Sequence, residues 1–449
     1  MNRRLYGRER RLKRGVARLG LAILLTLTLA SSAPSPRCLG EDTPETDPFL
    51  DLAPLLSPDI PSLQSTLRRD ESWWSRDTQF RRELFLQTAV RDSSSASNSS
   101  SSLYNRHSLG FEWLRRFQGA TSTIATCDLQ MRAVRRDSYM PVIQDMEGAY
   151  RIPWAVEYHN AYCDIFNPVG YFLDEQQSAG LVGKVNARIG RFYLPLGLNL
   201  ATDTHGTILQ LSNDQNIGFE RDWYAGFWGS LSPSISYDAY YLAGSGYDLR
   251  FDGQSGMFGF RLSTGPAIKN ELGLEGGLST LIGERLAGDH QRLAGEAASK
   301  TDAGTIITTR RFGPDLRYTI PSEIGSFTTT NEASFGSDDG NDTAIHLHQI
   351  GYLTNSRRWG ANLQLRQQWR KTPTITPPHH HHETPPPPGL NQSTSSAVSR
   401  SLFYDLSYYF SNDIANANLH WLNLCIEQIL ESERRGSGTI FSVQYYRYW

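Results

Sequence analysis

The last twelve residues, 438–449, place the strongest constraint on what this chain can fold into. They read GTIFSVQYYRYW, and alternate positions fall into two sets. One set is apolar except for an arginine: Phe441, Val443, Tyr445, Arg447 and Trp449. The other set is more polar: Ser442, Gln444, Tyr446 and Tyr448. Alternation with a period of two is typical of a β-strand whose two faces meet different surroundings.

Strand-length runs with the same alternation recur from about residue 80 onward. Residues 305–335 are less regular, and we assign two strands to them. The clearer runs are 80–92, 107–119, 125–133, 152–159, 185–189, 223–231, 235–243, 258–262, 272–278, 345–348, 361–370, 402–410 and 419–421. The pattern predicts an all-β fold, a transmembrane antiparallel β-barrel of about 16 strands, which is wide enough to keep an aqueous channel.

The absence of a long apolar run favours a barrel over a helix as the means of crossing a membrane. No stretch of about 20 apolar residues exists in the chain, so no transmembrane helix is available. In hydrocarbon every backbone N–H and C=O needs a partner, and strands achieve this by closing into a barrel with no free edge. A secreted β-sandwich or propeller is the alternative, but such folds have shorter strands, and we find no repeat of fixed period.

The N-terminal region predicts export. Residues 1–33 read as a secretory signal peptide, with a basic start, the apolar stretch Leu19–Ala30 and the small residues Ser31, Ser32 and Ala33. We expect a polar periplasmic lead-in segment at 34–79 and the barrel at 80–449. Long loops are expected near 92–103, 285–304 and 372–399.

Charge excludes one class of partner. The formal net charge is −2, but the predicted signal peptide is basic. Its removal leaves 36 basic and 45 acidic residues, a net charge of −9. A mature chain this acidic is not expected to bind nucleic acid.

The four cysteines, Cys38, Cys127, Cys163 and Cys425, form no CxxC pair and lie at no metal-binding spacing with histidine. Cys127 and Cys163 lie on neighbouring predicted strands. A symmetric hairpin register does not place them opposite each other, so a disulfide between them is the less favoured of the two readings.

Two stretches resemble known proteins. The final strand is similar to the carboxy-terminal assembly signal of bacterial outer-membrane β-barrel proteins, which end on Phe or Trp. Residues 184–223, which contain KVNARIGRFYLPLGLNLATDTH and GFERDW, resemble the phosphate-selective porin O and P family. The matching positions are Gly190, Arg191, Phe192, Pro195, Gly197 and Leu198. The resemblance implies a channel in the outer membrane of a Gram-negative cell, and a homotrimer. The chain departs from the phosphate-selective members in its scarcity of lysine, since it has five lysines in all.

Charged residues on the polar faces are the candidates for the pore lining. We single out Arg132, Glu157, Arg188, Glu275, Arg366 and Arg370. A file of arginines along a pore wall would attract anions, because guanidinium stays charged and offers a donor fork to oxyanions. In the alternative, these arginines pair with acids such as Glu112, Asp128, Glu157 or Glu275 and only stiffen the wall.

A histidine tract is the candidate metal site. His379, His380, His381 and His382 lie in PPHHHHETPPPPG, and consecutive histidines beside Glu383 can bind Zn, Ni or Cu. The proline-rich flanks favour an exposed loop, so a purely solvated tract is the alternative.

An acidic cluster around Gly340 has two readings. Asp338, Asp339, Asn341 and Asp342 could gather a calcium ion, although their spacing does not fit a helix-loop-helix calcium loop. A hairpin turn explains the same residues through their turn chemistry and is favoured.

These features together predict an outer-membrane porin that lets small hydrophilic solutes diffuse. We expect outer-membrane lipid, small hydrophilic or anionic solutes and the outer-membrane assembly machinery as partners, and no cofactor. The chain contains no GxSxG, HExxH or phosphate-loop motif, so we predict that it is not an enzyme. The alternative is a closed outer-membrane or secreted β-domain with a binding or structural role.

Overall fold

The computed structural model of the chain describes its sheet and the connections next to it. All described residues belong to one compact unit, Thr46–Trp449. They are 77–92, 102–119, 123–136, 154–172, 180–198, 217, 221–246, 255–286, 306–373, 394–413, 418–432 and 437–449. The predicted signal peptide, most of the lead-in segment and the histidine tract lie outside the described residues.

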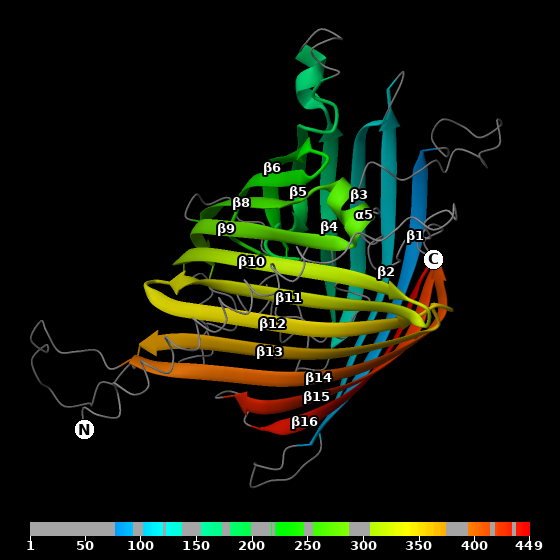
Figure 1. Cartoon of the computed structure of the whole chain (residues 1–449), viewed down its shortest axis with the longest axis vertical. Helices are drawn as coiled ribbons and strands as arrows, with labels where there is room; N and C mark the ends of the chain where they lie inside the picture. Colours follow the sequence, from blue (N-terminus) through cyan, green and yellow to red (C-terminus); the bar gives the residue numbers. More distant parts are fainter. Residues whose placement is uncertain are drawn as a thin grey trace, which may run out of the picture. The chain divides into compact units, whose positions relative to one another are not determined.

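Sixteen strands in the described residues form one closed antiparallel barrel, as predicted (Figure 1). Each strand pairs with its neighbours in sequence. The bounds are β1 Thr78–Asp92, β2 Ser102–Gln118, β3 Thr123–Arg136, β4 Trp154–Phe166, β5 Asn186–Tyr193, β6 Arg221–Ser232, β7 Ile235–Leu242, β8 Gly256–Thr264, β9 Leu274–Leu286, β10 Ile306–Ser322, β11 Gly325–Asp338, β12 Asn341–Thr354, β13 Trp359–Pro373, β14 Thr394–Asp413, β15 Asn418–Ser432 and β16 Gly438–Tyr448.

The seam of the barrel joins β1 to β16. Their register runs from the pair Glu83 and Tyr448 to the pair Asp92 and Thr439. Beyond the last strand, Trp449 extends the ladder: its N–H donates to the Arg82 carbonyl at 3.0 Å, and the Arg82 N–H donates to its carbonyl at 2.7 Å. The sheet therefore closes on itself and satisfies the backbone of both strands at the seam.

The alternation predicted for the last strand is confirmed. Phe441 and Val443 are 49% and 46% exposed, whereas Gln444, which belongs to the other face of the strand, is fully buried. The same division holds around the barrel, where large apolar side chains are exposed on one face of the strands and most polar ones are buried on the other. We call these the outer face and the inner wall. An outer face this rich in apolar side chains fits a hydrocarbon surrounding.

Three features of the described connections were not predicted from the sequence. β14 begins at Thr394, so its first residues lie in the stretch expected to be a loop. A short helix, α5 (Pro266–Leu272), joins β8 to β9, although Leu272 was expected in a strand. Pro266 fixes a helical start and Gly273 ends the helix in a left-handed conformation, at φ 61°. A 3-10 turn, η3 (Pro168–Phe172), follows β4. Within the described residues, no helix is both long and apolar enough to cross a membrane.

The acidic cluster around Gly340 forms the predicted hairpin turn. β11 ends at Asp338, which pairs directly with Asn341 at the start of β12. The two residues between them, Asp339 and Gly340, have φ of 47° and 78°. Two consecutive left-handed residues are typical of the tightest β-hairpin turns.

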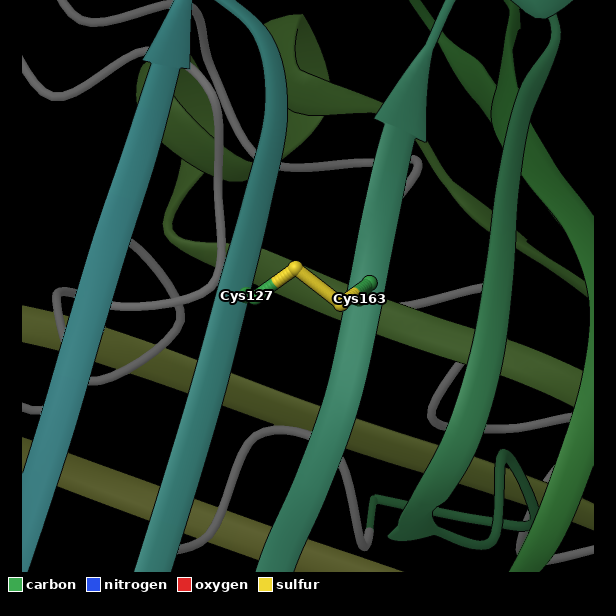
Figure 2. The surroundings of a disulfide bond; sticks show 2 residues. All are labelled: Cys127 and Cys163. Atoms are coloured by element: carbon green, nitrogen blue, oxygen red, sulfur yellow. A yellow bond between two sulfur atoms is a disulfide. The ribbon is translucent and has the colours of Figure 1, made fainter.

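The structure corrects the reading of the cysteines: Cys127 on β3 and Cys163 on β4 form a disulfide (Figure 2). Their Cα atoms lie 4.1 Å apart, directly opposite in the register. A one-residue shift between Gln130 and Met131 is responsible, because without it Cys127 would face Tyr162. A symmetric hairpin does not contain that shift. Both sulfurs lie on the outer face, since Asp128 and Asp164 next to them belong to the inner wall.

The faces of β12 are opposite to those expected from polarity. Ile345 and Leu347 are buried on the inner wall, in register with Gln368 and Arg366. His346 and His348 share the outer face with Ile350, which is half exposed. Register with β11 and β13 fixes the faces here, and the side-chain polarity of β12 does not.

Candidate functional site

Three of the charged residues predicted to line the pore, Arg132, Arg188 and Arg366, are buried on the inner wall. Arg132 and Arg366 are buried on β3 and β13, and each meets an acid from another strand. Arg132 forms an ion pair with Glu83 on β1. Glu157 occupies the register position opposite Arg132 on β4.

Arg188 on β5 has the best-defined surroundings of the predicted residues. Its Nε and Nη2 donate to the two carboxylate oxygens of Asp164 at 2.7 and 2.9 Å. The indole N–H of Trp228 donates to the same carboxylate at 3.2 Å. The guanidinium carbon lies 3.6 Å from the centre of the Phe192 ring. A paired fork that also stacks on an aromatic ring holds a fixed position.

Glu275, Arg366 and Arg370 also contact or face residues of neighbouring elements. Glu275 on β9 pairs with Arg317 on β10, and Lys269 of α5 lies 3.9 Å away. Arg366 donates to the Ser401 hydroxyl at 3.3 Å and lies 3.9 Å from Glu427. Arg370 is opposite Thr343 in the register. The structure thus distributes the predicted residues around the wall and does not gather them into one cluster.

The arginines of the inner wall pair with acids, as in the alternative in which they only stiffen the wall. Most of these acids differ from those named from the sequence. Of the acids named from the sequence, Glu112 pairs with Arg81 and Glu275 pairs with Arg317, and neither arginine was predicted to line the pore. An unpredicted pair, Arg261 on β8 and Asp315 on β10, is buried and bidentate. Such pairs fix the wall and reduce the field that each arginine projects into the barrel.

A segment after β5 turns into the barrel interior. Residues 194–198 are buried, and three hydrogen bonds tie them to the inner wall of strands that are not neighbours of β5. The Tyr240 hydroxyl on β7 donates to the Pro195 carbonyl at 3.1 Å. The Gly197 N–H donates to the Ser279 hydroxyl on β9 at 3.1 Å, and the Leu198 N–H donates to Glu332 on β11 at 3.4 Å. We call residues 194–198 the inward segment.

Gly197 is a structural requirement of the inward segment. Its φ of 61° lies in the left-handed region, which glycine adopts without strain. A Cβ at this position would overlap the Glu332 carboxylate. The glycine therefore permits both the turn of the chain and its close approach to β11.

A second set of contacts fixes the root of the inward segment. The Asp222 carboxylate at the start of β6 accepts hydrogen bonds from the N–H groups of Gly244, Ser245 and Gly246, at 2.6, 3.3 and 3.0 Å. Arg191 at the end of β5 donates to the Gly246 carbonyl at 2.8 Å and to the Tyr158 carbonyl at 3.0 Å. Strand ends β4 to β7 are thereby joined around the point where the segment leaves the wall.

Apolar packing completes the anchoring. Leu194 and Leu196 are buried in one cluster with aromatic side chains of the inner wall. The Phe192 ring meets the Tyr162 ring edge-on at a centroid distance of 4.5 Å, and the rings of Tyr224 and Tyr240 stack at 5.5 Å. The positions that carried the family resemblance, from Gly190 to Leu198, thus form the junction of wall and inward segment.

Four of the residues that hold the inward segment were not predicted from the sequence: Asp222, Tyr240, Ser279 and Glu332. Asp222 lies within the GFERDW stretch and was quoted only as part of a resemblance. Glu332 lies in the stretch with weak alternation. Neither signal indicates that these residues meet a chain segment from another part of the barrel. His379–His382, the candidate metal ligands, lie outside the described residues.

Comparison with known proteins identifies the fold. No protein-family model and no curated protein sequence matches the chain. Among solved structures, OprB of Pseudomonas putida is similar, with a TM-score of 0.50 and 9% identity over 84% of this chain and 95% of that one. OmpF of Salmonella typhi has a TM-score of 0.48 and 11% identity, over 83% and 97%. An anion-selective porin from Comamonas acidovorans has a TM-score of 0.46 and 9% identity, over 83% and 98%.

The likeness to OprB and the barrel itself define the class: this chain has the fold of an outer-membrane porin. The porin fold that the sequence resemblance implied is confirmed.

Proposed function

We propose that the protein is an outer-membrane porin through which small hydrophilic solutes diffuse. The observation that carries this proposal is the combination of an apolar outer face with a charged inner wall and an inward segment tied across the interior. An inward segment narrows a barrel that would otherwise be wide, so it sets a size limit for solutes.

Anion preference is the finer part of the proposal. The arginines of the inner wall support it, since they outnumber lysines there and keep their charge at any physiological pH. The acids paired with Arg132, Arg188 and Arg261 oppose it. We therefore expect a weak anion preference, smaller than an unpaired file of arginines would give.

One observation favours a second function, a closed barrel with a binding or structural role. Several polar side chains of the inner wall are inaccessible to solvent, among them Ser401, Glu427 and Gln444, each at 0% exposure. A water-filled channel leaves its lining in contact with water. The two functions make opposite predictions for conductance.

Single-channel recording of the refolded mature protein in a planar bilayer tests the proposal. Discrete current steps are expected, and a salt gradient gives the ion preference from the sign of the reversal potential. A folded protein that produces no steps supports the closed barrel instead. A reversal potential of cation-selective sign overturns the anion preference and leaves the pore in place.

Partners and oligomeric state belong to the same proposal. Outer-membrane lipid and the assembly machinery are expected from the fold and from the final strand, and a homotrimer is expected from the porin resemblance of residues 184–223. A trimer form is described for OmpT of Vibrio cholerae, whose TM-score of 0.48 is too low to support the same state here. That the protein is not an enzyme stays a prediction, and hydrolytic assays of the purified barrel check it.

A further inference from the structure

Arg447 is the charged residue that interrupts the apolar face of the last strand. It is exposed on the outer face of β16, two residues beyond Tyr445. Its guanidinium carbon lies 4.8 Å from the centre of the Trp449 ring. Arg82 on β1 is exposed on the same face, and its backbone forms the two seam hydrogen bonds with Trp449. Trp449 therefore lies beside both arginines, and we call Arg82 and Arg447 the seam arginines.

The seam arginines lie at the level of a row of aromatic side chains on the outer face. Tyr408 on β14 contacts Phe410, with ring centroids 5.0 Å apart, and Phe410 stacks on His420 of β15 at 4.4 Å. The ring of His420 meets the Tyr445 ring edge-on at 5.2 Å. Arg447 is directly opposite His420 in the register. Rows of aromatic residues mark the boundary between hydrocarbon and headgroups in outer-membrane barrels.

This row belongs to the end of the barrel that is expected to face the periplasm. The connections at this end that join β12 to β13 and β14 to β15 are short, 355–358 and 414–417. The connection between β13 and β14, at the other end, runs from 374 to 393. Short turns face the periplasm and long loops face the exterior in barrels of this kind. We therefore expect the seam arginines at the depth of the phosphate groups of the periplasmic leaflet, which consists of phospholipid.

The surroundings of the seam arginines leave their charge uncompensated. Within the described part of the chain, no ion pair includes either of them. An outer-face cation at the other end of the barrel, Arg400, lies 3.7 Å from Glu431. The seam arginines are also close to each other, since Arg447 is opposite Leu84, two residues from Arg82. Like charges on neighbouring strands repel, and an anion between them removes that repulsion.

We propose that the seam arginines bind the headgroup phosphate of an anionic phospholipid, such as phosphatidylglycerol. A guanidinium group is a planar donor fork that matches the oxygens of a phosphate. Phosphatidylglycerol keeps a net negative charge, whereas the ammonium group of phosphatidylcholine neutralises its own phosphate. Phe441 and Val443, which precede Arg447 on the outer face and are half exposed, offer apolar surface to the acyl chains. The inference rests on the outer-membrane location and does not depend on an open pore.

Heat unfolding of the refolded mature protein in a neutral detergent tests the lipid class. Added phosphatidylglycerol is expected to raise the unfolding midpoint more than the same amount of phosphatidylcholine does. Equal shifts for the two lipids overturn the proposal. Inorganic phosphate is the third addition, and a shift as large as that of phosphatidylglycerol would show a site for free anions instead of a lipid site. Refolding in vitro keeps the assembly machinery out of the measurement.

Variants then test the two residues. Arg82→Gln combined with Arg447→Gln removes both charges and keeps polar side chains of similar length. Native mass spectrometry counts the phosphatidylglycerol that each barrel retains, and the affinity is expected to fall roughly fivefold for each arginine removed. The matched control is Arg400→Gln, because that exposed outer-face arginine already has an acidic partner. It is expected to bind phosphatidylglycerol like the parent.

Two outcomes contradict the site. Undiminished lipid binding in the double variant shows that the seam arginines do not hold the headgroup. An equal loss in the Arg400 variant shows that surface charge in general attracts the lipid. If the double variant does not fold, the single change Arg447→Gln decides by the same criteria. Conductance of the same samples is expected to match the parent, so it reports separately on the proposed function.

Discussion

The backbone N–H of Leu198 donates a hydrogen bond to the carboxylate of Glu332, 134 residues later in the chain. The bond joins the connection after β5 to the inner wall of β11. Together with the Gly197 and Pro195 contacts, it fixes the inward segment at three points on three strands. The segment is therefore fixed to the wall, and we expect its position to set the free cross-section of the interior.

Replacing Gly197 by alanine is expected to displace the inward segment. The left-handed φ costs roughly 1–2 kcal/mol for a residue with a Cβ, and the added carbon would also overlap Glu332. Gly340→Ala is the matched control, because its φ of 78° brings the same strain and no atom lies within 4 Å of the added carbon. Single-channel conductance should change in the Gly197 variant alone. Equal conductance in both variants would show that the segment does not limit the pore.

Tyr240→Phe is expected to loosen the same segment more gently. The change removes the hydrogen bond to the Pro195 carbonyl, which contributes about 1 kcal/mol. Tyr241→Phe serves as the control, since that hydroxyl lies on the outer face and is 3.5 Å from its acceptor. Open-channel current noise should rise in the Tyr240 variant. The prediction is wrong if both variants are as quiet as the parent.

Breaking the buried pair of Arg261 and Asp315 tests the weak ion preference. Asp315→Asn leaves the guanidinium without its charge partner, which costs about 3–5 kcal/mol for a buried pair. The reversal potential in a salt gradient should move toward anion preference. The double change Arg261→Leu and Asp315→Leu removes both charges and should return the stability and the ion preference close to the parent values. An unchanged reversal potential in Asp315→Asn would place this pair away from the ion path.

The disulfide is expected to stabilise the β3–β4 hairpin. A loop of this size, with a sequence separation of 36, corresponds to about 3–4 kcal/mol in the chain-entropy description. A reducing agent should lower the heat-unfolding midpoint of the parent protein. It should have no effect on the double variant Cys127→Ser and Cys163→Ser. Cys425→Ser controls for the buried thiol on β15 and should respond to reductant like the parent.

Removing Trp449 is expected to impair insertion into the outer membrane. The residue makes two backbone hydrogen bonds to Arg82 at the seam and carries the aromatic end of the predicted assembly signal. Trp449→Phe keeps both features and should insert normally. The measurement is the heat-modifiable fraction in isolated outer membranes. Normal insertion of the shortened chain would show that the signal does not depend on its last residue.

The strands could be predicted from the sequence because a sheet with one apolar and one polar face shows the period-two pattern within each strand. Phe441 and Gln444 take opposite faces as that pattern requires. Contacts that depend on the register between strands could not be predicted. The cysteine pair needed a one-residue shift beside Gln130, and His348 took the outer face because β11 and β13 already fixed the register.

In the candidate site too, the faces of the residues could be predicted and their contacts could not. Arg132, Arg188 and Arg366 lie on the inner wall, and their part in lining a pore stays a prediction. Their partners were not predictable, because the acids come from strands whose relative heights depend on every turn between them. Glu332 could not be selected either, since its role depends on a segment that crosses from β5.

The seam between β1 and β16 has a consequence for cut or rearranged chains. Every strand is hydrogen-bonded to two neighbours, and the first and last strands are neighbours of each other. A chain nicked in one connection, for example within residues 374–393, is expected to stay assembled and to separate into fragments only on unfolding. Because β1 and β16 are adjacent, the outer ends of these two strands could be joined and new chain ends opened in another connection. The barrel is then expected to fold with its strands in a different order along the gene.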